Sequence, residues 1–261
     1  MTKLKDFNRA LWLILLPAHV LGFIALFYLT EYWLTLFVFW FIIGVIGNGV
    51  AAHRYFSHNQ FQTYTPIRYI LAYLTTLGGV GSPTEWSIFH TVHHAKADKK
   101  GDLHSPKNSN IFYVFYGWII TLNHSSYLSE RYARRIAVTQ RRNSFLRFFH
   151  YNRIIIMYLT VFILFLINPV YVLLYSLTLC LDFFRIGCVN YFCHTSGYKN
   201  HALKDDSRNN LILGWLGMGF GWHNNHHAHV GKLILHERWW EIDVEGYVGW
   251  LLSKDKFKLN Q

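Results

Sequence analysis

Four stretches of apolar residues limit what this chain can fold into more than any other feature of its sequence. They cover residues 11–30, 33–52, 152–167 and 170–188. About 20 apolar residues in a helix cross the hydrocarbon layer of a bilayer. The whole chain is 52% hydrophobic and only 15% charged, whereas soluble domains carry about 25% charged residues. The sequence therefore predicts an integral membrane protein built from helices.

Short polar turns join these segments in pairs. Glu31 and Tyr32 separate the first two segments, and Asn168 and Pro169 separate the last two. Each pair would cross the membrane and return, which leaves nearly all charged residues on one face. The first segment lacks the small-residue cleavage site of a signal peptide, so we expect it to remain as an anchor.

The basic residues set the expected orientation. Lys3, Lys5 and Arg9 precede the first segment, and Lys and Arg are retained on the cytoplasmic side. We therefore predict one all-α integral membrane domain over residues 1–261. It has four transmembrane helices in two hairpins, with both termini and the active site cytoplasmic. Residues 53–151 and 189–261 contain nearly all of the chain's histidines. We expect them to form a cytoplasmic helical cap that holds a histidine-rich dimetal site.

Net charge and cysteines exclude other classes. The formal charge is +11, but the basic residues form no reading helix or RNA-binding motif, so no nucleic-acid partner is expected. Cys180, Cys188 and Cys193 contain no CxxC pair, which argues against a disulfide framework and against a thiolate metal site.

Sixteen histidines need an explanation, and half of them form three short motifs. These are HRYFSH, HTVHH and HNNHH, with the histidines His53, His58, His90, His93, His94, His223, His226 and His227. Residues at i, i+3 and i+4 share one face of a helix, so each HxxHH motif should point three imidazoles at one place. His53 and His58 lie about 140° apart on an α-helix. We expect them to diverge at a helix end or to reach two different metals.

The number and type of these side chains indicate two metal ions. Eight imidazoles are too many for one ion, and neutral imidazole suits Fe, Zn, Cu and Ni. A structural zinc site would close its shell with four ligands. Each motif follows an apolar segment, where the chain would leave the bilayer. An all-imidazole pair of metals beside a membrane suggests redox chemistry on a lipid-phase substrate.

With these motifs the chain resembles the membrane fatty acid desaturase family, of the acyl-CoA and acyl-lipid delta-9 type. The family's histidine boxes are HxxxxH, HxxHH and HxxHH, and this sequence has all three in that order. The segments that flank the boxes also fit, namely Asp98 with residues 101–106, residues 207–210 and residues 239–243. The resemblance runs from about residue 11 to residue 252.

The resemblance implies two Fe ions (Fe2+/Fe3+), O2 as co-substrate and a cis double bond placed in a saturated acyl chain, at delta-9. It also implies that His194 ligates a metal directly and that Asn190 does so through a water. The acyl chain would be linked to CoA, lipid or a carrier protein. No haem or iron-sulfur motif is fused to the chain, so a separate electron donor such as ferredoxin or cytochrome b5 is expected.

Two departures from the family pattern flank the third box. Gly219-Phe220-Gly221 stands where Gly-Glu-Gly is usual, and Ala228-His229-Val230 follows the box. The missing carboxylate could have oriented a metal-ligating histidine without binding the metal itself. Further residues could act in that way, although a solvated loop explains the two aspartates equally well. These candidates are Asp98, Asp102, His104 and His229.

Arg134, Arg135 and Arg142 recur at helical spacing within a segment rich in arginine. Two interpretations stay open for this expected cytoplasmic stripe. It attracts anionic lipid, or it also receives a phosphate-bearing acyl carrier or an acidic electron donor, since the guanidinium fork binds two oxygens at once.

Other functions remain possible on the same residues. A hydroxylase or ketolase would use the same scaffold and return oxygen to the carbon. A non-catalytic membrane metal-binding or transport protein would need polar residues along its spans, and these segments have few. A desaturase-like chain that no longer turns over is the remaining alternative, and Phe220 is its only sign.

Overall fold

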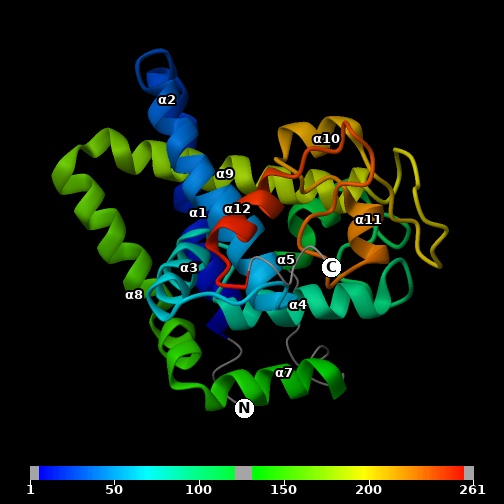
Figure 1. Ribbon diagram of the computed structural model, residues 1–261. Helices are drawn as coiled ribbons and strands as arrows, with labels where there is room; N and C mark the ends of the chain where they lie inside the picture. Colours follow the sequence, from blue (N-terminus) through cyan, green and yellow to red (C-terminus); the bar gives the residue numbers. More distant parts are fainter. Residues whose placement is uncertain (1–5, 121–130, 256–261) are drawn as a thin grey trace.

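The computed structural model describes residues 6–120 and 131–255, and helices dominate that part of the chain (Figure 1). The first half contains α1 (Asp6–Ala25), η2 (Leu26–Tyr28), α2 (Leu29–Trp40), η3 (Phe41–Ser57), α3 (Thr65–Leu77), α4 (Pro83–Lys96), η4 (Tyr113–Gly117) and α5 (Trp118–Ile120). The second half contains α7 (Arg131–Arg142), α8 (Ser144–Ile167), α9 (Pro169–Phe192), α10 (Leu211–Leu216), α11 (His223–Ala228) and α12 (Val244–Leu252). The only β pairing among the described residues is a pair of isolated bridges at Asn209. The predicted all-α class is confirmed.

Three helical stretches are long and apolar enough to cross a membrane. They are Leu13–Ser57, Ser144–Ile167 and Pro169–Phe192. Many of their large apolar side chains face outward, including Phe27 and Leu166, which are 77% and 67% exposed. Such a surface suits lipid rather than water. The molecule is therefore expected to associate with a membrane.

The backbone bends where the sequence predicted the first turn. Tyr28 (φ −109°, ψ 5°) and Tyr32 (φ −119°, ψ 16°) leave helical geometry, and the chain reverses at the tip between α1 and α2 (Figure 1). At the second turn Asn168 ends α8 and caps α9, because its Oδ1 accepts the Val170 N–H at 3.0 Å. Pro169 then occupies the first turn of α9, a favourable place for it. Both helices are longer than the predicted segments, since α8 already begins at Ser144 and α9 continues to Phe192.

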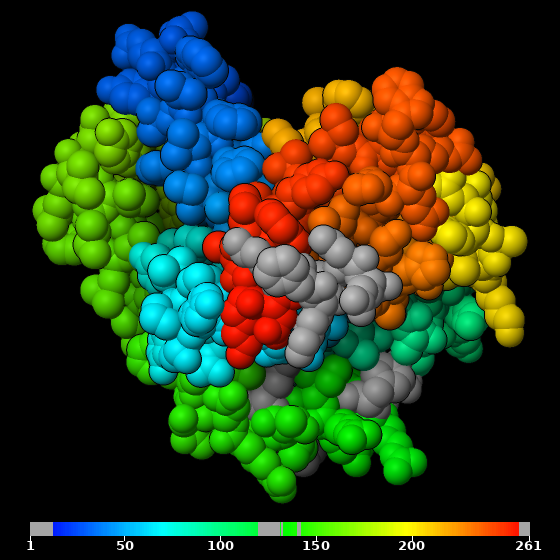
Figure 2. Space-filling view, viewed as in Figure 1, coloured from blue at the N-terminus to red at the C-terminus, as the bar shows by residue number. Residues whose placement is uncertain are grey.

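Helix α9 lies at the centre of the fold. It packs against α1, α2, η3, η4 and α8, and most of its inner half is buried. The C-terminal residues, orange to red in Figure 2, cover one face of the molecule, where α12 packs on η3. Gly49 of η3 permits this approach, since a side chain there would collide with the Glu245 carboxylate.

Candidate metal centre

The first histidine box lies at the end of η3, which is a π-helix. The His58 N–H donates to the His53 carbonyl at 3.2 Å, an i→i+5 bond. This wider turn brings residues five apart back to the same side, and the two imidazole centroids lie 5.1 Å apart. The prediction that His53 and His58 diverge was wrong, because it assumed an α-helix. π-turns are rare and occur often at functional sites.

The second box lies on α4, whose start is fixed locally. Ser82 Oγ accepts the Glu85 N–H at 3.2 Å, and Glu85 Oε2 accepts the Ser82 N–H at 2.8 Å. This reciprocal pair is a capping box, and Pro83 occupies the first turn. The helix then runs without a break through His90, His93 and His94.

The third box lies on α11, which has only six residues. A helix this short is not stable alone, so its position depends on neighbours. The two asparagines between its histidines supply the anchors. Asn224 Oδ1 accepts the backbone N–H groups of Asn200 and His201, both at 2.8 Å. Asn225 Nδ2 donates to the Leu235 carbonyl at 2.8 Å and to Glu241 Oε2 at 2.9 Å.

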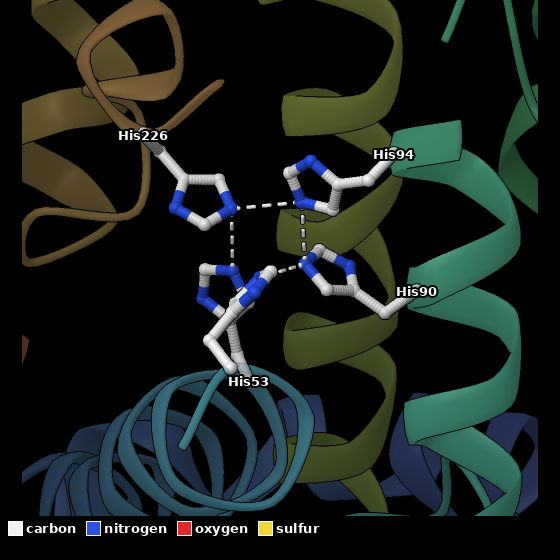
Figure 3. A group of neighbouring side chains, drawn as sticks. His53, His90, His94 and His226 are labelled. Carbon is white, nitrogen blue, oxygen red and sulfur yellow. Dashed lines mark hydrogen bonds between the residues drawn. The ribbon is translucent and has the colours of Figure 1, made fainter. Parts of the chain in front are cut away.

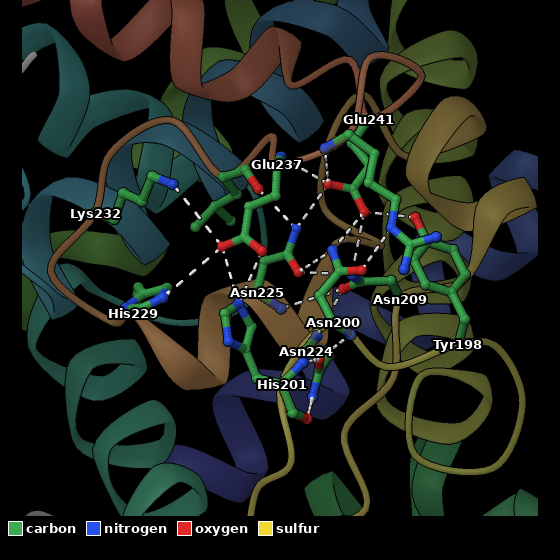
Figure 4. A network of polar contacts seen from close by, with 12 residues as sticks. Tyr198, Asn200, His201, Asn209, Asn224, Asn225, His229, Lys232, Glu237 and Glu241 are labelled. Atoms are coloured by element: carbon green, nitrogen blue, oxygen red, sulfur yellow. Dashed lines mark hydrogen bonds and ion pairs between the residues drawn. The ribbon is translucent and has the colours of Figure 1, made fainter.

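Glu241 is the centre of this polar network (Figure 4). Its side chain is almost fully buried, yet it accepts six hydrogen bonds. The donors are the Tyr198 hydroxyl, the amides of Asn200, Asn209 and Asn225, and the backbone N–H groups of Glu237 and Arg238. Burial opposes ionisation of this carboxyl, but these donors lower its pKa overall. The network fixes α11 from behind, and the sequence had not marked Glu241 for this role.

The histidines gather into two groups, which we call cluster A and cluster B. Cluster A consists of His53, His58, His90, His94 and His226, and cluster B consists of His93, His194, His223 and His227. Within each cluster the ligand nitrogens lie within 4.8 Å of one another. In cluster A the Nε2 atoms of His53 and His226 are 3.0 Å apart, and those of His90 and His94 are 2.9 Å apart (Figure 3). In cluster B the Nε2 atoms of His194 and His223 are 3.0 Å apart.

Each HxxHH motif serves both clusters. On α4, His90 and His94 belong to cluster A and His93 to cluster B; on α11, His226 belongs to cluster A and the other two to cluster B. The expectation that each triplet points at one place was wrong, since residues at i and i+4 pair while residue i+3 turns to the other cluster. The two helices are complementary in this division.

The imidazole nitrogens of each cluster are better suited to binding a cation than to hydrogen-bonding one another. Burial lowers the pKa of His90, His94, His223 and His226 well below the usual value, so these rings are neutral and carry a free lone pair. Within residues 6–120 and 131–255, the buried Nε2 atoms of His93 and His227 have no hydrogen-bond partner. Neutral imidazole is the form that ligates metals. Each cluster can therefore hold one ion.

Three aspartates stand behind cluster B. Asp98 Oδ2 lies 2.7 Å from His194 Nδ1, Asp102 Oδ1 lies 3.0 Å from His93 Nδ1, and Asp205 Oδ2 lies 3.3 Å from His227 Nδ1. Burial opposes their ionisation, but the histidine contacts outweigh it. They lower the pKa of Asp98 to about 2 and lower the pKa values of Asp102 and Asp205. The sequence had suggested the first two aspartates and missed Asp205, which lies far along the chain.

The other predicted residues divide by location. Asn190 and His104 line one cavity together with His93 and His223, and the His104 ring lies 4.5 Å from that of His93. His229 lies instead beside His201, at 4.8 Å between ring centroids. Its contacts within the described residues give no support to a role behind the box histidines.

Phe220 replaces the usual carboxylate and has its own contacts. Its ring centroid lies 5.3 Å from that of His53 and 4.7 Å from the Arg185 guanidinium carbon. Arg185 in turn donates to Asp182 Oδ1 at 2.7 Å and to Glu245 Oε1 at 2.8 Å. Phe220 is thus packed between a candidate ligand and a buried cation.

A second buried arginine extends this ion network to the first box. Arg54 Nη2 lies 2.8 Å from Asp243 Oδ1, and Arg54 Nε lies 3.5 Å from Glu245 Oε2. The network ties η3, α9 and the C-terminal segment together. Sequence reasoning missed it, although charged residues within apolar segments are a usual sign of functional or structural importance.

An aromatic cavity adjoins the clusters. One part is lined only by apolar side chains, including Phe115, Phe183 and Ile186. It shares Trp86, Phe89 and Trp118 with the cavity that contains box histidines of both clusters. Apolar and aromatic side chains therefore border the cavity that histidines of both clusters line.

The arginine stripe is helical, as predicted. Arg134, Arg135 and Arg142 are exposed on α7, whereas Ala133 and Ala137 are buried on the side that packs on α4. These three arginines belong to neither histidine cluster.

Long apolar helices around two buried histidine clusters, each of which could hold a metal ion, are typical of a membrane-associated, metal-binding class of protein. The fatty acid desaturase family model matches residues 31–232, and the chain belongs to this family. It is 30% identical to the icosanoyl-CoA 5-desaturase of Limnanthes douglasii, over 94% of this chain and 68% of that protein. It is also 30% identical to delta-9 acyl-lipid desaturase 2 of Arabidopsis thaliana, over 88% and 75% of the two chains.

A third relative is also 30% identical to this chain. The sn-1 stearoyl-lipid 9-desaturase of Synechocystis sp. is 30% identical over 80% of this chain and 64% of its own length. The family and the named relatives make this chain an oxidoreductase of the desaturase type, as the sequence predicted.

Proposed function

We propose that this protein is an O2-dependent fatty-acyl desaturase that places a cis double bond, at delta-9, in a saturated acyl chain. The observation that supports the proposal is a cavity lined by histidines of both clusters, which shares three aromatic side chains with a neighbouring apolar cavity. Apolar side chains beside the candidate ligands suit a hydrocarbon substrate, which would lie along them.

Clusters A and B would hold two irons, the pair that the family generally uses. When bound, the irons would supply the activation of O2 that removing hydrogen from an unactivated methylene requires, which no side chain provides. The protein's own residues bind and position the chain. Trp86, Phe89 and Trp118 line both cavities, and their buried rings would exclude water from the reacting carbons. Asn190 would reach the cluster B ion through a water.

The position of the double bond is a finer proposal than the reaction. Relatives at the same identity include both 9-desaturases and 5-desaturases, so identity alone does not separate the two. We propose delta-9 because the histidine boxes and their flanks resemble that type. Expression in a host that lacks the activity, followed by chromatography of fatty-acid methyl esters, tests this directly. A product with the double bond at another carbon contradicts delta-9 and leaves the desaturase intact.

Four transmembrane helices in two hairpins remain our proposal for the topology. The stretch Leu13–Ser57 has 45 residues, about twice the length that one crossing needs, and it bends at Tyr28 and Tyr32. Both termini and the histidine centre would then face the cytoplasm in a single domain. Lys3 and Lys5, which motivated this orientation, lie outside the described residues. Reporter fusions at Glu31 and Asn168 should both read as non-cytoplasmic.

The acyl carrier and the electron donor remain proposals too. A separate ferredoxin or cytochrome b5 would supply electrons, and CoA, lipid or a carrier protein would present the chain. We propose that Arg134, Arg135 and Arg142 of α7 receive an anionic partner or the membrane surface. The test replaces all three with Gln and measures KM for each carrier across salt concentrations. An unchanged KM everywhere would leave only a membrane-anchoring role.

A hydroxylase on the same scaffold is the second candidate. It would use the same clusters and cavity, and the product distinguishes it, since the fatty-acid methyl esters would then carry an added hydroxyl group. A non-catalytic metal-binding protein would give metal content without any altered fatty acid.

A further inference from the structure

The two histidine clusters differ in what stands behind them. In cluster B, the Nδ1 atoms of three of the four imidazoles contact carboxylate oxygens. These buried or half-buried carboxylates belong to Asp98, Asp102 and Asp205. In cluster A, no carboxylate pairs with any of the five imidazoles among the described residues. The buried Nδ1 atoms of His53 and His226 have no hydrogen-bond partner in the described part of the chain.

Charge adds to this contrast. Cluster B has three anionic groups in direct contact with its rings. The closest charged side chain to cluster A along the chain is Arg54, a cation next to His53, although Asp243 and Glu245 compensate its charge. A metal ion bound at cluster B is therefore placed closer to negative charge than one bound at cluster A.

A carboxylate that accepts the N–H of a ligating imidazole fixes its orientation and raises its basicity. Loss of one such partner typically costs about 10–100-fold in metal affinity or activity. Cluster A has one imidazole more than cluster B, which favours cluster A. Three carboxylates act in the other direction, and by this magnitude they outweigh a single additional neutral donor.

We propose that the two metal positions fill in order, cluster B first and more tightly, cluster A second, with Asp98, Asp102 and Asp205 as positioning residues that create the difference. This inference rests on the proposed function, since it takes both clusters to hold a metal. It makes cluster A the exchangeable position. A chain starved of metal would keep one ion at cluster B and lack the pair.

The test is a titration of the metal-free protein in lipid nanodiscs with Co2+, followed by the visible absorption of the ion and by calorimetry. Wild-type protein should bind two equivalents in two separated steps. Asp205→Asn and Asp102→Asn should each weaken the first step by about 10–100-fold and leave the second unchanged. His58→Ala, in cluster A, should weaken the second step and leave the first unchanged.

Asp206→Asn is the matched control. Asp206 is the neighbour of Asp205, but its carboxylate pairs with Lys107 at 2.9 Å and contacts no box histidine among the described contacts, so both steps should stay as in wild-type. Circular dichroism of each metal-free variant confirms that the helices are formed.

Three results would overturn the inference. They are two equivalents of equal affinity in the wild-type protein, an effect of Asp205→Asn on the second step only, or no effect of either aspartate variant. Each leaves the desaturase proposal intact, because both positions still bind metal. Binding of fewer than two equivalents by wild-type protein would contradict the dimetal centre itself.

Discussion

Helices α4 and α11 carry the same HxxHH motif and are held in opposite ways. Helix α4 has 14 residues and begins at its own capping box of Ser82 and Glu85. Helix α11 has six residues and depends on the buried network around Glu241. The first is specified by nearby sequence, and the second by residues brought together from across the C-terminal part.

The division of the histidines completes the comparison. Helix α4 gives two imidazoles to cluster A and one to cluster B, and α11 gives one and two. Neither helix builds a metal position alone. The motif thus sets which side chains are available, and the relative placement of the two helices decides which metal each side chain serves.

The largest effect should come from removing a ligand on either helix. His90→Ala on α4 and His226→Ala on α11 should each reduce product below detection, a loss beyond the roughly 100-fold known for outer partners, with the protein still inserted in membranes. Product chromatography and membrane fractionation measure both. His236→Ala is the control, since this exposed histidine contacts Tyr247 and lies in neither cluster; it should keep wild-type activity. Normal turnover in either box variant would break the account of two shared clusters.

Glu241→Gln should act on α11 and not on α4. The Gln side chain would place an N–H donor against groups that are themselves donors. An unsatisfied buried polar group costs about 1–3 kcal/mol. We expect a lower free energy of unfolding and roughly 10–100-fold weaker metal binding, measured by thermal unfolding and metal titration. Glu237→Gln is the neighbouring control, because the side chain of Glu237 is partly exposed and pairs with His201. Equal effects of the two variants would show that Glu241 has no special role.

Phe220 precedes α11 and contacts His53 of the first box, so its replacement tests the packing between α11 and the first box. We expect Phe220→Glu to retain or raise metal content and activity, because the new carboxylate would lie beside Arg185, whose guanidinium now lies over the ring. Phe220→Leu removes the ring without adding charge and should cost about 1 kcal/mol of stability through the lost cation–π contact. A sharp loss of activity in the Glu variant alone would mean that a charge there is harmful.

Ser82→Ala should have the smallest effect, limited to the start of α4 and to the contact of Ser82 Oγ with His150 Nδ1 on α8, which is 3.0 Å long. Loss of the cap typically costs about 1 kcal/mol, which α4 can tolerate because it has 14 residues and packs on η3 and α7. Thermal unfolding should shift slightly, and the desaturated product should remain near the wild-type level. A complete loss of activity would show that α4, like α11, depends on a fragile contact.

The sequence predicted what local patterns determine. Apolar length predicted the long helices, and Asn168 and Pro169 predicted the second turn. The three histidine boxes predicted which imidazoles gather, but their spacing did not predict how they divide between the clusters. The misses share a non-local cause. The π-turn that reunites His53 and His58 rests on an i→i+5 backbone bond that the sequence did not indicate, and the split of each HxxHH motif involves histidines of both α4 and α11. Asp205 and Glu241 act on residues 22 and 16 positions away in sequence, a relation that no local pattern contains.

Iron content measured together with turnover is the most direct test of the central claim, that clusters A and B together hold the ions for desaturation. Protein purified without oxygen is assayed for iron and for product, before and after chelation and after iron is returned. The account predicts two irons per chain, loss of product on chelation and recovery when two equivalents of iron are restored. A chain that keeps full turnover with one iron or none would contradict it.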